Sequence, residues 1–277
     1  MLARQRHAYI LERLRADGAV RVADLVHDLG VSDMTVRRDL EVLHEQRLLD
    51  KVHGGATSVA PSALFEPGFR AKAELQQDVK EVIADVAARL VSPGQAIAIS
   101  AGTTTYAVAR RLVDVPSLTV VTNSVPVADV LYHGGRSDQT VILTGGVRTP
   151  SDALVGPFAV AALRTVNVDL VILGVHGMDP RAGFTTPNLL EADTDRALVE
   201  AGRRLIVVAD HTKWGVIGVS TIADLSQADI VVSDTALPED ARMALEASAR
   251  ELVIAGEPRR PASLSVVPGP ESDPPER

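Results

Sequence analysis

A glycine and three consecutive threonines, Gly102, Thr103, Thr104 and Thr105, follow the aliphatic run QAIAIS and precede YAVARRL. The pattern predicts a buried strand that ends in a short turn at the start of a helix. Free backbone N–H groups and the positive end of the helix dipole favour an anion at such a point, and threonine hydroxyls add donors without charge. One threonine would suffice for an ordinary helix cap. We therefore predict a phosphate-binding loop, although the residues match neither a Walker A loop nor a GxGxxG dinucleotide fingerprint.

Further polar side chains follow other predicted strands of this part of the chain. Asn123 follows LTVVT, His176 and Asp179 follow VDLVILG, and Asp210 and Lys213 follow RLIVVA. Strand ends of a parallel sheet share one edge, so these groups are expected to converge with the threonine loop on a polyhydroxylated anionic ligand. Each has a structural alternative: a helix cap for Asn123, a braced turn for Asp210, a buried structural role for His176. Lys213 is the strongest candidate, because a strand-end loop beside the only tryptophan is an unusual place for a solvated charge.

A second group of candidates, Thr35, Arg37 and Arg38, lies near the N-terminus of the chain. They fall off the apolar stripe that Val36, Leu40 and Leu43 give to a predicted helix over residues 33–47, which Ser32 is placed to cap. Hydroxyl and guanidinium groups suit phosphates and guanine edges. A solvated helix face is the alternative interpretation.

Two shorter predicted helices come before this one. Ile10, Leu11 and Leu14 form the apolar stripe of the first, which Gly18 ends, and an apolar stripe over residues 22–29 that ends at Gly30 forms the second. A support helix, a tight glycine-containing turn and a third helix are the parts of a helix-turn-helix, whose recognition helix enters the major groove. The following LLDKVHGGAT, with Lys51, His53 and a Gly-Gly turn, is predicted to form a β wing that touches DNA or a hairpin that covers the small core.

Composition sets the protein class. A hydrophobic fraction of 46% with only 3% aromatic residues is typical of the aliphatic core of a parallel α/β sheet. The absence of cysteine excludes a disulfide framework and thiolate chemistry. We find neither a signal peptide nor a run long enough to span a membrane, and expect a cytoplasmic protein without membrane partners. The histidine spacing lacks helical metal-site pairs, and no metal or cofactor is expected.

Net charge bears on the DNA-binding hypothesis. The chain carries −8 overall, which opposes nucleic-acid binding, but residues 1–57 have nine Lys or Arg against nine Asp or Glu and four of the seven histidines. The acidic excess therefore lies in the remainder. A near-neutral N-terminal region in a chain whose remainder is acidic is compatible with DNA binding.

The chain divides into regions of different character. Seven short aliphatic runs alternate with helical patterns after residue 76, which indicates a mostly parallel sheet covered by helices. The fold class is therefore α/β, with an N-terminal winged helix-turn-helix before the sheet domain. We assign 1–57 to the DNA-binding domain, 58–75 to a linker, 76–256 to the sheet domain and 257–277, rich in Pro, Ser and charge, to a disordered tail.

The run VSDMTVRRDLEVLHEQRLLDKVHGGAT strongly resembles the N-terminal signature of the DeoR family of bacterial regulators. The resemblance implies a DNA-contacting region that contains Ser32, Thr35, Arg37, Arg38, Lys51 and His53, with Asp39 and Leu40 structural. It extends over nearly all of residues 3–255.

The GTTT loop, the VVTNS segment, TGG and ADHTK resemble the sensor domain of the same family, which is related in fold to ribose-5-phosphate isomerase. This resemblance implies a phosphosugar effector contacted by Gly102, the three threonines, Asn123 and Lys213. One position departs from the family pattern, since Asp195 stands where a basic residue is usual. That departure leaves an unphosphorylated polyol or sugar derivative open.

Together these features predict a homo-oligomeric transcriptional regulator, a repressor of a sugar or polyol catabolic operon. Its partners would be double-stranded operator DNA and a small sugar phosphate that controls DNA affinity. A sugar-phosphate isomerase or deaminase is the main alternative, with Asp179, Glu191, Asp193 and Lys213 as candidate acid–base and electrophilic groups. A sugar-binding module without regulatory output is the third.

Overall fold

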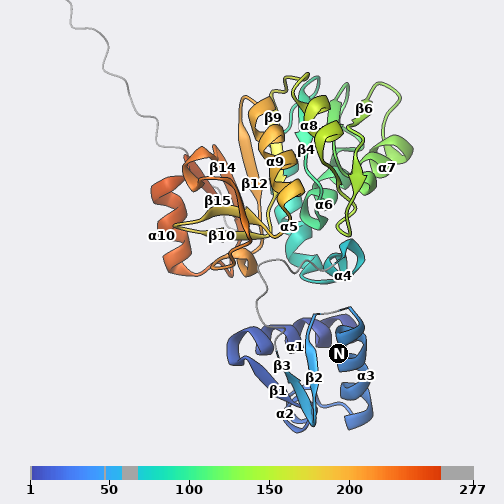
Figure 1. Cartoon of the computed structure of the whole chain (residues 1–277), viewed down its shortest axis with the longest axis vertical. Helices are drawn as coiled ribbons and strands as arrows, with labels where there is room; N and C mark the ends of the chain where they lie inside the picture. The colour runs from blue at the N-terminus through green and yellow to red at the C-terminus, as the bar shows by residue number, and fades with distance from the viewer. Residues whose placement is uncertain (1, 47, 58–67, 257–277) are drawn as a thin grey trace, which may run out of the picture.

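The structure is a computed structural model that describes residues 2–46, 48–57 and 68–256 (Figure 1). The predicted tail, 257–277, and most of the predicted linker lie outside the described residues. No helix within the described ranges is long and apolar enough to cross a membrane.

The N-terminal region is a winged helix-turn-helix, as predicted. Its elements are α1 (Ala3–Asp17), β1 (Ala19–Arg21), α2 (Val22–Leu29), α3 (Asp33–Glu45), β2 (Asp50–Val52) and β3 (Gly55–Thr57). The strands form an antiparallel sheet in the order β1-β3-β2. The three helices and the sheet enclose one buried cluster, which includes Ile10, Leu25, Val36, Leu40 and Leu49. The α2–α3 turn passes through Gly30 in the left-handed conformation (φ 61°), where a side chain would be strained.

The larger region is built on a seven-stranded parallel sheet. Its strands are β4 (Ala96–Ile99), β5 (Thr119–Thr122), β6 (Thr140–Leu143), β9 (Leu170–Gly174), β12 (Leu205–Val208), β14 (Ile230–Asp234) and β15 (Glu251–Ala255). Their spatial order is β15-β14-β12-β9-β4-β5-β6, all parallel. The chain adds β5 and β6 on one side of β4 and the other four strands on the opposite side. Because the winding direction reverses between β4 and β9, the strand ends there open a crevice in which ligands of such sheets bind.

Helices cover both faces of this sheet (Figure 1). One core cluster joins the sheet to α5 (Gln77–Ala88), α6 (Thr103–Leu112) and α7 (Val125–Gly134). The other joins it to α8 (Pro157–Leu163), α9 (Leu189–Ala201) and α10 (Glu239–Ser248). Neighbouring residues of one strand divide between the clusters, as Ile97 and Ala98 do, because side chains alternate across a strand. Burial on both faces explains why the inner strands are uninterrupted aliphatic runs.

Short elements supplement the parallel sheet. They are α4 (Phe69–Glu74), the antiparallel strands β10 (Gly177–Asp179), β11 (Gly183–Thr186) and β13 (Ser220–Ala223), the pair β7 (Val147–Arg148) and β8 (Leu154–Val155), and 3₁₀ helices at His211–Lys213 and Leu225–Gln227. Helix α4 lies in the segment predicted as linker. The Phe69 amide donates to the carbonyl of Pro150 (3.0 Å), and the Phe69 ring meets Tyr106 edge-on at 5.7 Å. The described end of that segment therefore packs on the α/β region.

Candidate nucleic-acid interface and ligand pocket

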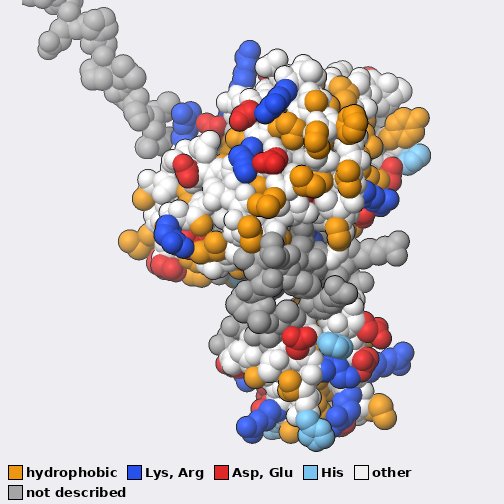
Figure 2. Space-filling model, viewed as in Figure 1, with side chains coloured by type: hydrophobic (Ala, Val, Ile, Leu, Met, Phe, Trp, Pro, Cys, Tyr) orange, Lys and Arg blue, Asp and Glu red, His pale blue; other side chains and the backbone are white. Residues whose placement is uncertain are grey.

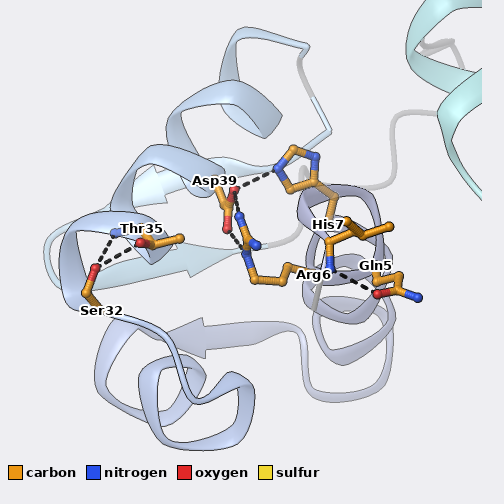
Figure 3. Close-up of polar contacts among 7 residues, drawn as sticks. Gln5, Arg6, His7, Ser32, Thr35 and Asp39 are labelled. Atoms are coloured by element: carbon orange, nitrogen blue, oxygen red, sulfur yellow. Dashed lines mark hydrogen bonds and ion pairs between the residues drawn. The ribbon is translucent and has the colours of Figure 1, made fainter.

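Helix α3 begins with a side-chain cap. The Ser32 hydroxyl accepts a hydrogen bond from the Thr35 amide (3.2 Å) and lies 2.8 Å from the Thr35 hydroxyl (Figure 3). Such a cap satisfies one of the N–H groups that the first turn of a helix leaves unpaired. Both hydroxyls thus fix the start of α3, and Ser32 also stays exposed at its tip.

Arginines follow on the outer face of the same helix. Arg37 and Arg38 are both exposed. The Arg37 guanidinium pairs with the Asp33 carboxylate one turn earlier, and this hydrogen-bonded pair raises the pKa of Arg37 above its usual value. Within the described part of the chain, Arg38 has no hydrogen-bond or ion-pair partner. A guanidinium presented in this way suits bidentate contact with a phosphate or a guanine edge.

Met34, on the same first turn, was not among the candidates from the sequence. Its side chain is 76% exposed. A thymine methyl group is the feature of the major groove that accepts apolar contact. The signal was present in the sequence, since Met34 also falls off the Val36, Leu40 and Leu43 stripe.

The wing places its two candidates at the surface. Lys51, on β2, is exposed and pairs with Glu41 of α3, which lowers the pKa of the Glu41 carboxyl through the hydrogen bond from the ammonium. His53 is exposed in the turn between β2 and β3. The hairpin also contributes Leu49 and Ala56 to the small core, so it covers that core and presents polar side chains outward.

Asp39 orients the recognition helix from within. Its carboxylate, 5% exposed, accepts hydrogen bonds from the Arg6 guanidinium at 2.6 and 3.0 Å and lies 3.0 Å from His7 Nε2 (Figure 3). These contacts join α1 to the middle of α3. Asp39 therefore has the structural position that the resemblance implied.

A pocket opens at the switch point of the seven-stranded sheet. Its lining comes from the ends of β4, β5 and β9 together with α4, α6, α9, β11, β13, the β7–β8 connection and the 3₁₀ helix His211–Lys213. Six predicted effector contacts line it: Gly102, Thr103, Thr104, Asn123, His176 and Lys213. The lining also includes Lys72, Ser151, Thr186, Glu191 and Asp195.

The first turn of α6 forms one wall. Gly102 precedes the helix at φ 151°, and Thr103 and Thr104 line the pocket. Thr105 does not line it: its side chain is fully buried, and its hydroxyl donates to the Gly102 carbonyl (3.0 Å). A helix turns about 100° per residue, so three successive side chains cannot all face one pocket. Thr105 is thus a structural residue of this turn.

Asn123 shapes the adjoining loop. Its side-chain oxygen accepts from the Ala101 amide (2.9 Å) and its amide nitrogen donates to the Leu154 carbonyl (3.3 Å), at 1% exposure. Both hydrogen bonds hold the backbone that leads into Gly102. The helix cap of α7, considered for Asn123, is instead the hydroxyl of Ser124, which accepts from Val127.

Lys213 and Lys72 make part of the lining electropositive, and His176 lies within reach of both charges. Burial and the positive charges of Lys213 and Lys72 lower the pKa of His176 to about 4, so the imidazole is neutral at pH 7. Burial would raise the pKa of Asp210, but the charge of Lys213 and a hydrogen bond from Thr212 outweigh it and lower the pKa. Asp210 itself is 1% exposed and is not a lining residue. It lies next to the lysine and accepts from the Thr212 amide (3.0 Å), which braces the loop.

Asp179 is the predicted contact that the fold places elsewhere. Its carboxylate accepts from the amides of Arg181 and Ala182, each at 2.9 Å, and closes the turn from β10 to β11. It is not a lining residue of the pocket. The sequence showed a polar residue soon after a strand, but β9 ends at Gly174 and Asp179 belongs to the next, antiparallel strand.

Glu191 is a lining residue that had been considered only as a catalytic carboxylate. It is 7% exposed and accepts hydrogen bonds from the hydroxyls of Thr149 (2.7 Å), Ser151 and Thr186 (3.4 Å). Of the other candidates for catalysis, Asp193 is exposed and lies outside the lining, as Asp179 does. Glu191 and Lys213 are therefore the two of that group that share the pocket.

Lys72 was missed because it lies on α4, in the segment predicted as linker. Ser151 and Thr186 come from the β7–β8 connection and β11, which sequence periodicity did not reveal. The only signal for Lys72 was a lysine close after Phe69 in a segment with Ser, Pro and scattered apolar residues.

Two family models match this chain. Residues 6–62 match the model of the DeoR-like helix-turn-helix domain, and residues 75–235 match that of the DeoR C-terminal sensor domain. The uncharacterised HTH-type transcriptional regulator YgbI of Escherichia coli K12 is 36% identical, covering 92% of this chain and 99% of its own.

Two further relatives cover most of the chain. The HTH-type transcriptional regulator GlpR of Haloferax volcanii is 35% identical (90% of this chain, 96% of its own), and the glycerol-3-phosphate regulon repressor of E. coli K12 is 33% identical (84% and 92%). Among solved structures, a ribose-5-phosphate isomerase in complex with phospho-erythronic acid aligns with a TM-score of 0.38 at 14% identity, over 50% of this chain and 54% of its own.

Proposed function

The chain belongs to the DeoR family of transcriptional regulators, and from this premise we propose that it represses a sugar or polyol catabolic operon until a phosphorylated sugar metabolite binds its pocket. The observation that carries the effector class is the meeting of the α6 N-terminus, Lys72 and Lys213 in one pocket at the switch point of the sheet.

The α6 N-terminus and the two lysines together favour a phosphate ligand. Unpaired N–H groups of a first helical turn point toward the ligand, and the helix dipole adds partial positive charge. Two ammonium groups supply full charges, while Thr103, Thr104 and the neutral His176 supply uncharged hydrogen-bonding groups. The remaining lining, with Ser151, Thr186 and two carboxyl side chains, suits the hydroxyls of a sugar or polyol.

DNA binding rests on α3 and the wing. The major groove would be contacted by the start of α3, through Ser32, Thr35, Arg37 and Arg38. The DNA phosphate backbone would be contacted by the wing, through Lys51 and His53. Because Arg37 and Lys51 have acidic partners in the chain, DNA phosphates would have to compete with Asp33 and Glu41 for them. Arg38 has no such competitor among the described residues, and we assign it the largest share of operator affinity.

A homodimer would present two recognition helices to two half-sites. We assign its contact to α8 and α9, where Phe158, Leu189 and Leu190 are 80%, 59% and 46% exposed. Figure 2 shows hydrophobic side chains gathered over the part of the surface where these helices lie in Figure 1. The groove between the helices is lined by charges of both signs, Arg164, Asp193, Arg196 and Glu200, so a two-fold related copy could pair unlike charges.

Regulation then requires unequal binding. The effector must bind the arrangement that releases DNA more tightly than the arrangement that holds it, since equal affinity shifts no equilibrium. The test is fluorescence anisotropy with DNA from upstream of the chain's own gene, with and without a panel of sugar monophosphates. Specific, salt-sensitive DNA binding that one monophosphate weakens supports the proposal. Specific binding that no member of the panel changes would refute the effector class.

Catalysis is the second candidate function, because Glu191 and Lys213 share the pocket. Three hydroxyl donors surround the Glu191 carboxylate, which fixes its position and favours binding over proton transfer. Assays of aldose–ketose interconversion with pentose and hexose phosphates distinguish an effector-binding protein from an enzyme. Turnover would move the assignment to an isomerase.

A further inference from the structure

We infer that Glu191 and Asp195 make the pocket selective for monophosphates, by excluding a second phosphate or a carboxylate at the end of the ligand remote from α6. This inference rests on the proposed function, since it concerns the same pocket and the same class of ligand. It goes further by stating which charge the remote end of the effector must lack.

The two carboxyl side chains lie on one face of one helix. Glu191 and Asp195 are four residues apart on α9, a spacing that puts side chains on successive turns of the same face. Both line the pocket, and their exposed fractions are only 7% and 8%. Asp193, between them, points to solvent and pairs with Arg196 (3.3 Å). The pocket therefore has an acidic wall built from buried side chains of α9.

The Glu191 carboxylate of the acidic wall is held in place. Thr149 and Ser151 from the β7–β8 connection and Thr186 from β11 donate hydroxyl hydrogens to Glu191. A carboxylate fixed in this way cannot swing out to solvent when a like charge approaches. In the low dielectric of a half-closed pocket, two like charges at close range repel much more strongly than in water.

The opposite character of the α6 wall sets the orientation of the ligand. Helices α6 and α9 cover opposite faces of the sheet, so the N–H groups of α6 and the carboxylates of α9 line the pocket from different sides. Lys72 belongs to the α6 side, because α4 packs on α6 through Phe69 and Tyr106. The carboxylates on the α9 side accept hydrogen bonds. A sugar monophosphate satisfies both walls, with its phosphate at α6 and its hydroxyls donating to Glu191 and Asp195. A bisphosphate can satisfy only the α6 wall. Its second phosphate is an anion at neutral pH and would be repelled by the carboxylates of the α9 wall. Specificity would thus arise from repulsion of the wrong ligand as well as attraction of the right one.

The test is isothermal titration calorimetry of the full chain with matched pairs: fructose 6-phosphate with fructose 1,6-bisphosphate, and ribulose 5-phosphate with ribulose 1,5-bisphosphate. We expect at least one monophosphate to bind tenfold or more tightly than its bisphosphate. In Asp195→Asn the ratio should fall at least threefold, mainly because the bisphosphate gains affinity. Glu246→Gln removes an exposed charge from α10, outside the pocket lining, and should leave the ratio unchanged.

Asp195→Ser is a second variant in case the asparagine perturbs folding, which thermal unfolding would reveal. A bisphosphate that binds as tightly as its monophosphate, or a ratio that neither Asp195 variant alters, overturns this inference while leaving the phosphosugar effector intact. Unphosphorylated fructose or ribulose binding as tightly as its monophosphate would instead refute the proposed phosphate site. Binding of no member of the panel would refute both.

Discussion

The Arg6 guanidinium lies 2.6 Å from the Asp39 carboxylate and so joins the first helix of the DNA-binding region to its recognition helix. Asp39 lies one position after Arg38 in the chain, but it points inward where Arg38 points outward. The angle at which α3 presents its outer face thus depends on an ion pair on its inner face. Mutation of this pair should affect DNA binding without removing any group that touches DNA.

We predict that Asp39→Ala destabilises the helix-turn-helix by roughly 2 kcal/mol, because it leaves Arg6 and His7 without their shared partner in a largely buried place. Hydrogen–deuterium exchange of the full chain should show faster exchange in α1 and α3 with protection of the parallel sheet unchanged. Glu45→Gln, an exposed change on the same helix, is the control. Equal protection of α1 in Asp39→Ala and the wild type would show that the pair is dispensable.

For the operator contacts, replacing both Arg37 and Arg38 with alanine should weaken specific DNA binding roughly 100-fold or more, since each good base or phosphate contact contributes about 1–3 kcal/mol. Of the single variants, Arg38→Ala should lose more than Arg37→Ala, because Arg37 has to leave Asp33 to bind. Anisotropy at several salt concentrations measures both. Arg13→Ala, on α1, controls for the loss of one positive charge. Undiminished operator affinity of the double variant would remove α3 from the interface.

Lys213→Ala should retain operator affinity and lose the response to the effector, with ligand affinity reduced roughly 10- to 100-fold for a lost charged hydrogen bond. Because Lys213 also compensates the buried charge of Asp210, the variant could be less stable, and Lys213→Gln keeps a donor in the loop. Arg250→Ala, an exposed cation remote from the lining, is the matched control. A folded Lys213 variant that fails to bind DNA would contradict the division of roles between the two regions.

The sequence was sufficient to predict the sheet because each strand is a distinct aliphatic run. Burial on both faces accounts for this in the inner strands, whereas β6, at one edge, is largely exposed. All seven predicted runs are strands of the parallel sheet, and the first two helices end where Gly18 and Gly30 predicted. The short antiparallel strands were not predicted, because two to four residues show no periodicity that distinguishes them from turns.

The pocket was predictable only in part, for a geometric reason. Residues at the ends of parallel strands share an edge wherever the strands lie, so Gly102, Thr103, Asn123 and Lys213 could be expected together. Which of several adjacent polar side chains faces the crevice depends on local rotation, and Thr105 turns inward. Contributors from outside the strand ends, such as Lys72, depend on how a connecting segment docks, which sequence patterns do not encode.

The neutral His176 gives the α/β region a distinct pH dependence. Its pKa of about 4 in the folded chain lies below its ordinary 6.5, so between these values the unfolded chain binds a proton that the folded chain does not. The free energy of unfolding must therefore fall as the pH decreases from 6.5 toward 4, and this group contributes no pH dependence above that range. At pH 5 the loss attributable to His176 should be roughly 2 kcal/mol.

Urea unfolding of the wild type and His176→Gln at pH 7.5 and pH 5 measures this loss, with the fluorescence of the only tryptophan, Trp214, as the signal. Other titrating groups cancel in the difference between the two proteins. The stability of the wild type relative to the variant should decrease by roughly 2 kcal/mol from pH 7.5 to pH 5. A difference that stays constant between the two pH values would mean that the imidazole is not desolvated in the folded chain.

The proposed dimer contact can be tested at Phe158, the most exposed large hydrophobic side chain on α8. Phe158→Glu places two like charges across a two-fold axis and removes the apolar area that would be buried, so the assembly should dissociate. Sedimentation velocity should show a smaller species, and affinity for DNA with two half-sites should fall at least tenfold because the two heads no longer bind together. Effector affinity should be retained, since Phe158 lies outside the pocket lining.

Met243→Glu, a 64% exposed position on α10, introduces the same charge on another helix and should change neither the sedimentation coefficient nor the DNA affinity. An unchanged sedimentation coefficient in Phe158→Glu would place the self-contact elsewhere than α8.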